Sequence, residues 1–376
     1  MVGFSTRRAL VPALVVAFGI AVFDLSSNGA GALGTFLAGL VEQGSYRRDI
    51  SPRVEQARHD ALAWDPSGIQ SIHLAAGRGR VRSSVTLEPS RDLSVGVEAD
   101  LRVFADTERH AADYLSELKV TGTRVGGSLL IGLGEARIRP QYISDVEVRW
   151  AVRVPDGIPT EVSPGPTDVG ATGVRAPLTV RVGTGRVRIR GVAGDVEVFS
   201  AGPVDVKDVR GAVKVGGARQ AFICDISGDV ALDVTGGIGI AERVSGQVRV
   251  AARGGSAALR EIGGPIVAEC RTGDLDVEGL RDTCDVTAEY AAVNVEAECG
   301  DIRIRARGGS IRAELGAGNG GYAISAAGRF DDVITDLPVE VSEGQDGTKK
   351  ATGKVGEGVY LLQIGADNRC VIVLRG

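Results

Sequence analysis

The stretch GDIRIRARGGSIRAELGAG, residues 300–318, decides the fold, because glycine returns at every ninth position with apolar residues third and fifth in each unit. The same unit, G-x-Φ-x-Φ-x-x-x-x, begins at residues 185, 246, 264 and 273. Side chains alternate along a strand, so places three and five face one side while two, four and six face the other. Each unit is therefore predicted to be a short strand and a turn, with glycine at the corner, where a positive φ is often needed.

A single unit of this kind cannot bury its apolar edge, so the units must stack on one another. We therefore predict an all-β protein whose main part is a single-stranded parallel β-helix, a solenoid of nine-residue strand-turn units. Asp282 and Ala291 replace glycine without breaking the register, and some steps upstream are eight residues long. Outward charge pairs, each worth about 0.2–1 kcal/mol, do not decide between two and three units per coil. The eight-residue steps favour two.

Composition supports this interpretation and excludes others. The 376 residues include 54 glycines but only 13 prolines and 4% aromatic residues, without a strict triplet period, which excludes collagen. The core must consist mainly of valine, isoleucine, leucine and alanine. The net charge of −5 is dispersed over 43 basic and 48 acidic residues, so no basic field for nucleic acid is expected.

The N-terminus is typical of an export element. Arg7 and Arg8 precede an uncharged run from Ala9 to Phe23, and after Asp24 a second apolar stretch covers residues 29–41. A cleaved signal peptide fits the basic start and the length of the run. A membrane anchor fits if a helix continues into the second stretch, since spanning requires about 20 residues. Either interpretation places the rest of the chain outside the cytoplasm, exported and membrane-anchored or secreted.

Five segments are predicted from these patterns. They are an export signal or membrane anchor (1–41), a polar tether with at most one short helix (42–68), a strand-rich capping region (69–165), the parallel β-helix repeats (166–317), and C-terminal strands and cap (318–376). Ala111, Tyr114, Leu115 and Leu118 recur at helical spacing, so one amphipathic helix is expected to pack on the capping region. The tail GVYLLQIGADNRCVIVLRG is interpreted as either a cap or an adhesive edge.

The repeats contain no residue pattern that indicates a catalysed reaction. Asp195, Asp229, Asp274 and Asp301 each follow a corner glycine and could line a catalytic or calcium-binding edge, but Gly-Asp is also ordinary turn chemistry, which we favour. No histidine follows His110, and neither a calcium-binding nonapeptide nor a phosphate-binding loop is present. We predict no catalytic residues, cofactor or metal.

The cysteines also argue against a zinc site. None of Cys224, Cys270, Cys284, Cys299 and Cys370 forms a CxxC pair, and the histidines lie far away in the sequence. They are interpreted as small buried hydrophobic residues, with a Cys284–Cys299 disulfide as the alternative in an exported protein.

Two groups of outward arginines are candidates for binding a polyanion. They are Arg186, Arg188 and Arg190 in GRVRIRG, and Arg303, Arg305 and Arg307 in GDIRIRAR. The alternative is an ordinary solvated strand face of mixed charge. An envelope protein or a surface glycan is a further possible partner, and the open strand ends of a solenoid allow oligomers or end-to-end self-association.

The order of these segments resembles a known family. An export segment, the region AADYLSELKVTGTRVGGSLLIG, repeats of the form GDVxV and GxIxI, and the closing GEGVYLLQIGADNRCVIVL resemble the DUF4097 putative adhesin family over residues 70–376. The N-terminal segment, RRALVPALVVAFGIAVFDLSSNG, is similar to the hydrophobic segments of envelope-stress proteins of the Lia type. The resemblance implies a non-catalytic cell-envelope module, adhesin-like and related to autotransporter-adhesin head domains. It transfers no functional residue. The alternative function is a carbohydrate-active β-helix enzyme or a polysaccharide-binding protein.

Overall fold

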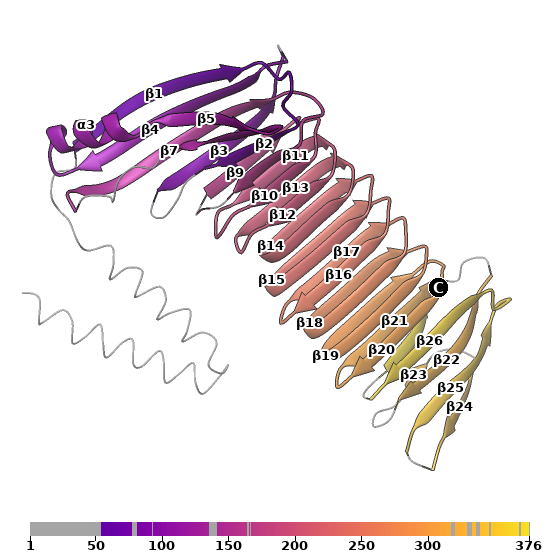
Figure 1. Ribbon diagram of the computed structural model, residues 1–376. Helices are drawn as coiled ribbons and strands as arrows, with labels where there is room; N and C mark the ends of the chain where they lie inside the picture. Colours follow the sequence, from indigo (N-terminus) through magenta and orange to yellow (C-terminus); the bar gives the residue numbers. More distant parts are fainter. Residues whose placement is uncertain are drawn as a thin grey trace, which may run out of the picture. The chain divides into compact units, whose positions relative to one another are not determined.

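Parallel strands paired at a spacing of 17 or 18 residues dominate the computed structural model (Figure 1). Leu178 pairs with Val196, Val196 with Val213, and Val248 with Ile266, so each coil is 17 or 18 residues long. Two nine-residue units therefore make one coil, and about nine coils follow one another. This confirms the predicted parallel β-helix.

The structure describes residues 54–76, 81–91, 93–134, 141–163, 165, 167–316, 320–328, 333–335, 339–345, 347–367 and 370–375. The chain divides into residues 1–52 and one further unit, residues 53–376, to which all described elements belong. The predicted export signal or anchor, 1–41, lies outside the described residues. No helix among those that are described is long and apolar enough to cross a membrane.

Most of the described residues lie in strands. The N-terminal elements are β1 (Val54–Trp64), β2 (Ser71–Ala75), β3 (Arg82–Pro89), β4 (Val95–Ala105), α3 (Glu108–Glu117), β5 (Val120–Val125), β6 (Ser128–Leu133) and β7 (Ile143–Val154). The middle elements are β8 (Thr160–Ser163), β9 (Thr167–Thr172), β10 (Leu178–Arg181), β11 (Val187–Ala193), β12 (Val196–Phe199), β13 (Pro203–Arg210), β14 (Val213–Ile226), β15 (Val230–Val244), β16 (Val248–Arg253), β17 (Ser256–Ile262), β18 (Ile266–Leu280), β19 (Cys284–Ala297), β20 (Ile302–Arg307) and β21 (Ser310–Gly316). The C-terminal elements are β22 (Tyr322–Gly328), β23 (Val333–Thr335), β24 (Glu340–Glu343), β25 (Lys349–Val355), β26 (Tyr360–Ala366) and β27 (Cys370–Arg375).

The coils have two faces, which we call face 1 and face 2. Face 1 consists of β2, β6, β8, β10, β12, β16, β20, β22, β26 and the first halves of β14, β15, β18 and β19. Face 2 consists of β3, β7, β9, β11, β13, β17, β21, β23, β27 and the second halves of the same four long strands. Each of the four long strands passes through a corner and contributes to both faces, and the register of β14 with β15 shifts there.

The interior is filled by the third- and fifth-place residues of the units, as the sequence predicts. Ile302 and Ile304 are at most 1% exposed, whereas Arg303 and Arg305 between them are exposed. Rows of valine, isoleucine, leucine and alanine run through every coil. Burying one such aliphatic side chain contributes roughly 1.5–3 kcal/mol, so these rows supply the main driving force for folding.

Corner glycines are needed mainly because successive corners lie very close together. A Cβ on Gly211, Gly228, Gly246 or Gly264 would lie only 2.5–2.7 Å from the carbonyl oxygen of the glycine one coil earlier. We expected positive φ to be the usual reason, but only Gly194, Gly273 and Gly300 have it among the glycines that open the predicted units. Contact between stacked corners is therefore the commoner cause.

The residues in the left-handed conformation also lie at the corners, but one or more positions away from these glycines in the sequence. Asp208, Asp225, Arg243 and Glu261 all have φ between 53° and 59°, at steps of 17 or 18 residues. Thr272 and Tyr290 occupy the same conformation at the other corner. The sequence pattern did not indicate these positions, since none of them is glycine.

Both ends of the stack differ from a simple repeat. Val54–Trp64, expected to belong to the polar tether, forms β1, which pairs antiparallel with β4. β4 pairs antiparallel with β7, and the parallel pairing already begins at β2, β3, β6 and β7. The predicted amphipathic helix is α3, which buries Ala111, Tyr114 and Leu115 and contacts β1 and β4.

The C-terminal strands are not the last in the stack. β26 lies between β20 and β22, and β27 lies between β21 and β23. β25 and then β24 continue antiparallel from β22. The tail that we expected to be a cap or an adhesive edge is therefore enclosed by earlier strands, as the order of labels in Figure 1 shows.

Candidate functional site

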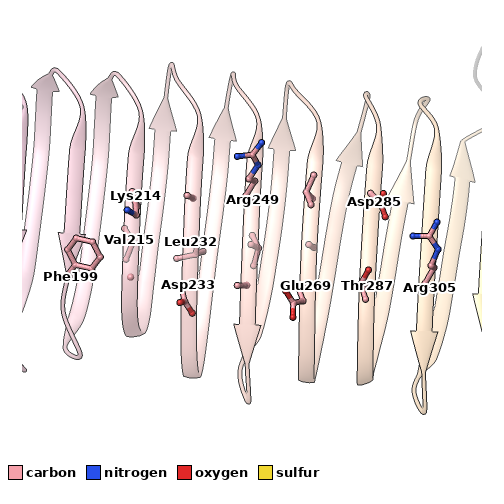
Figure 2. Close-up of a pocket in the computed structure, with 16 residues that line it drawn as sticks. Phe199, Lys214, Val215, Leu232, Asp233, Arg249, Glu269, Asp285, Thr287 and Arg305 are labelled. Carbon is pink, nitrogen blue, oxygen red and sulfur yellow. The ribbon is translucent and has the colours of Figure 1, made fainter.

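A groove crosses successive strands on the outer side of face 1. Its volume is about 570 Å³, and it extends from Phe199 on β12 to Arg305 on β20 (Figure 2). The strands present two outward columns of side chains, and small residues occupy the middle of both: Ala231 in one, Gly216 and Ala251 in the other. The groove exists because these side chains leave space that larger neighbours border.

A second hollow, of about 420 Å³, adjoins the first toward the corner of the coils. Lys214, Ala231 and Arg249 line both hollows, which are therefore adjacent. Asp195 and Asp229 line the second hollow, which places two of the predicted turn aspartates beside the groove.

Both signs of charge border the groove. Lys214, Arg249 and Arg305 supply the positive charge, and Figure 2 shows them on different strands of face 1. Asp233, Glu269 and Asp285 supply the negative charge. The groove therefore does not select for a polyanion or a polycation, and it offers hydrogen-bond donors and acceptors in alternation.

One carboxylate oxygen in the groove has no hydrogen-bond partner in the described part of the chain. Asp233 Oδ1 is buried from solvent and accepts no hydrogen bond there. An unsatisfied buried acceptor costs about 1–3 kcal/mol.

A chain of ion pairs leads into the groove from the N-terminal coils. His73 Nδ1 lies 3.1 Å from Glu161 Oε2, and Arg181 lies 3.4 Å from both Glu161 and Glu197. Lys214 Nζ lies 2.7 Å from Glu197 Oε1. The Arg181 guanidinium carbon and Lys214 Nζ are 4.5 and 5.3 Å from the centroid of the Phe199 ring, within cation–π range. Phe199 is thereby held in place at one end of the groove.

The corner aspartates have a structural role. Asp195 Oδ1 accepts from the N–H of Ala212 at 2.9 Å, and Asp229 Oδ1 accepts from that of Gln247 at 2.9 Å. Asp301 Oδ1 accepts from Leu361 N at 2.9 Å. Asp274 lies at the opposite corner, where its own N–H donates to Ser256 Oγ. Three of the four carboxylates therefore connect neighbouring coils, as turn chemistry predicts, and the four do not meet on one edge.

The two arginine groups lie on opposite faces. Arg188 and Arg190 are on face 2, where Asp205 lies 3.6 and 3.5 Å from them, and Arg186 precedes them at the corner. Arg303, Arg305 and Arg307 are on β20 of face 1, in register with Asp285, Thr287 and Glu289. The six arginines cannot form one surface. Polyanion binding by either group remains a prediction.

The described cysteines match the buried interpretation. Cys224, Cys270 and Cys284 are each 1% exposed, and Cys299 is partly exposed. All four are free thiols, so the alternative Cys284–Cys299 disulfide is not formed. Burial is the main cause that raises the pKa of the Cys270 thiol to about 11 and that of Cys284 to about 12. Within the described ranges, no group of three or more histidine, cysteine or acidic residues could hold a metal ion.

The groove itself was not anticipated from the sequence. The signal that could have revealed it is the column Gly216, Asp233, Ala251 and Glu269, in which small residues alternate with carboxylates, and it becomes visible only when residues 17 or 18 apart are aligned.

Comparison with known proteins gives only distant similarities. No protein-family model matches the chain, and no curated protein matches it. Among solved structures, a "putative adhesin" from Bacteroides fragilis is 14% identical, covers 68% of this chain and 97% of its own, and has a TM-score of 0.30. A "putative lipid binding protein" from Parabacteroides distasonis is 12% identical over 86% of this chain and 97% of its own, also at a TM-score of 0.30.

A third structure, a "putative cell adhesion protein" from Clostridium sporogenes, is 10% identical over 85% of this chain and 100% of its own, with a TM-score of 0.22. At such identities and TM-scores these similarities establish neither a family nor a function for this chain. Membership of the DUF4097 family therefore stays a prediction.

Proposed function

We propose that this protein is a non-catalytic binding module of the cell envelope that holds an extended glycan along the groove of face 1. The observation that carries the proposal is the groove over several coils, bordered by both signs of charge. Strands repeat about every 4.8 Å along it, so an extended polymer would cross several coils and meet a different set of side chains at each one.

The chemistry of the groove supports a hydroxyl-rich ligand. Asp233 and Glu269 offer carboxylate acceptors, whereas Lys214 and Arg249 offer donors to ligand oxygens. A sugar hydroxyl donates and accepts at one atom and can serve both kinds of group. Ligand pockets usually combine a mostly apolar surface with a few such polar groups, and the small residues of the groove fit that description.

The experiment measures binding of two fluorescent polysaccharides, neutral dextran and anionic polygalacturonate, to the full-length protein. Ala251→Trp would fill the middle of the groove and should weaken binding at least tenfold. Ala292→Trp, at a half-buried outer position of face 2, is the matched control and should bind normally. Failure of both polysaccharides to bind, or equal binding by the two variants, would contradict the proposal.

The same samples separate a binding module from a carbohydrate-active enzyme. Hydrolysis of a glycosidic bond needs carboxylates at the bound sugar, and Asp233, Glu269 and Asp285 are the carboxylates that line the groove. We expect no release of reducing ends by the wild-type protein. Release that Asp233→Asn or Glu269→Gln abolished would establish the enzyme instead.

Localisation forms part of the proposal and rests on residues 1–41 of the sequence. Fractionation of the native cells and the intact mass of the purified chain test it together. A mass starting at Met1 in the membrane fraction indicates a tethered protein, and a start near Leu33 in the exported soluble fraction indicates a free one. Full-length protein in the cytosol would contradict either form of export.

A further inference from the structure

On the outer side of face 2, the charge of the surface changes between β11 and β19. At the β11 end lie Arg186, Arg188 and Arg190, followed by Lys207 on β13, with Asp205 and Asp208 as the acidic residues of that strand. At the β18 and β19 ends lie Asp274, Asp276, Glu278 and Glu296, with Arg260 on β17 as the basic residue beside them. One end of this surface is therefore basic and the other acidic.

Apolar side chains lie on the strands between the two charged ends, beside an ion-paired group of Asp225, Glu242 and Arg243. Phe222 on β14 is 37% exposed and Ile238 on β15 is 55% exposed. Phe222 is in register with Ile240, and Ile240 is in register with Ala258 on β17. These four residues, Phe222, Ile238, Ile240 and Ala258, form the apolar centre of the surface.

A hollow of about 290 Å³ lies within the acidic end. Asp276, Glu278, Glu296 and Glu314 line it together with Arg312 and Asn294. Glu296 and Glu314 are direct neighbours in register, an arrangement that is unfavourable for like charges. Arg312 in the same hollow lies 2.7 Å from Glu314, so part of the negative charge is already balanced within the chain.

The spacing of these regions is symmetric about β15. β14 and β17 flank β15, β13 and β18 come next, and β11 and β19 follow. A two-fold axis beside Ile240, lying in the plane of the interface and parallel to β15, would set β11 of one copy against β19 of another. It would likewise set β13 against β18, and β15 against itself.

We propose that face 2 is a dimer interface at which two antiparallel copies of this chain pair the basic end of each with the acidic end of the other. Such an isologous contact is self-complementary, since every attractive pair occurs twice. The apolar centres of the two copies meet at the axis. This proposal uses face 2 alone and does not depend on the groove of face 1.

The size of the surface predicts a weak dimer. From β11 to β19 the strands span about 29 Å at about 4.8 Å per strand, and about four residues of width give a flat area near 400 Å² per copy. A standard stable interface buries about 800 Å² on each partner. We therefore expect a dissociation constant in the micromolar range, and a weaker dimer as salt screens the charges.

The test is sedimentation equilibrium of the full-length protein in a density-matched non-ionic detergent, at low and high salt. The variant Arg188→Glu/Arg190→Glu and the variant Glu278→Arg/Glu296→Arg should each dimerise at least tenfold more weakly. A mixture of the two variants should restore dimers, because both contacts of the mixed pair are then attractive. Arg303→Glu/Arg305→Glu, on face 1, is the control and should dimerise normally.

Each other outcome overturns the proposal. A wild-type protein that stays monomeric at high micromolar concentration excludes the dimer. Dimers unaffected by the two face 2 variants place the interface elsewhere. Loss of heparin binding in Arg188→Glu/Arg190→Glu, with no recovery of dimers in the mixture, assigns the basic end to a polyanion.

Discussion

At the scale of single residues, close contact between stacked corners favours glycine over residues with a side chain. A Cβ on Gly264 would lie 2.7 Å from the carbonyl oxygen of Gly246, a backbone atom that cannot move without disturbing its own coil. We expect Gly264→Ala to lower the free energy of unfolding by about 1–3 kcal/mol, the usual cost of overpacking. Urea denaturation followed by circular dichroism measures it.

Gly365 supplies the matched control for that substitution. It lies on β26, and a Cβ there would meet no atom within 4 Å. Gly365→Ala should therefore leave the stability unchanged or raise it slightly, since alanine is less flexible in the unfolded chain. Equal losses in both variants would show that flexibility, and not contact, decides the corner glycines.

Left-handed corners without glycine carry strain that a substitution should release. Thr272 has φ = 57°. At the equivalent corner positions, Gly254 one coil before Thr272 and Gly308 one coil after Tyr290 have φ near 70°. The left-handed conformation costs a side-chain-bearing residue about 1–2 kcal/mol, and glycine loses about 0.5–1 kcal/mol through its flexibility.

Thr272→Gly should therefore stabilise the protein by about 0.5–1 kcal/mol. Thr287→Gly, in the regular part of β19 where φ is negative, should destabilise it by a similar amount. Denaturation midpoints of the two variants should move in opposite directions. A shift of both midpoints to lower urea would count against strain at Thr272.

The thiols differ in accessibility and in protonation. Cys270 and Cys284 are buried, and their pKa values of about 11 and about 12 leave both protonated at pH 8, where the thiolate is the reactive form. We expect iodoacetamide at pH 8 to modify the partly exposed Cys299 first, with Cys270 and Cys284 modified only after unfolding. Peptide mass spectrometry follows each site separately, and early modification of Cys284 would contradict its buried position.

At the scale of strands, the sequence predicts the middle of the chain well because one local pattern determines both the strand and its inward face. Ile302 and Ile304 illustrate this, since alternation alone places them inside. The same pattern fails for Val54–Trp64, whose alternate residues are polar or charged and face solvent or α3. Only its pairing with β4 makes that segment a strand.

The candidate groove could not be predicted from the sequence, for a related reason. Its shape depends on outward residues of different coils, which alternation leaves free to vary, and on the number of units per coil. Charge pairs were too weak to determine that number from the sequence. Aligning Gly216, Asp233, Ala251 and Glu269 requires the register that the structure provides.

At the scale of the described unit, both ends of the stack use the same arrangement. β2 and β3 are covered by the later strands β6 and β7, just as β26 and β27 are covered by the earlier strands β22 and β23. Antiparallel strands then close each end. Open strand edges favour association with other chains, and β24 presents the exposed carboxylates Glu340 and Glu343 there.

This arrangement predicts the effect of shortening the chain. A variant ending at Gly358 lacks β26 and β27, so β20, β21 and β22 each lose a parallel partner. Leu362, Ile364 and Ala366 would no longer fill the last coils, at a cost of about 4–6 kcal/mol for the two larger side chains and the alanine together. We expect a lower thermal midpoint and large aggregates in sedimentation velocity, because the exposed edges of β20 and β21 can recruit other chains. A shortened protein that sediments as the full-length protein does, with an unchanged midpoint, would mean that β22 closes directly onto β20 and that the enclosed tail is dispensable.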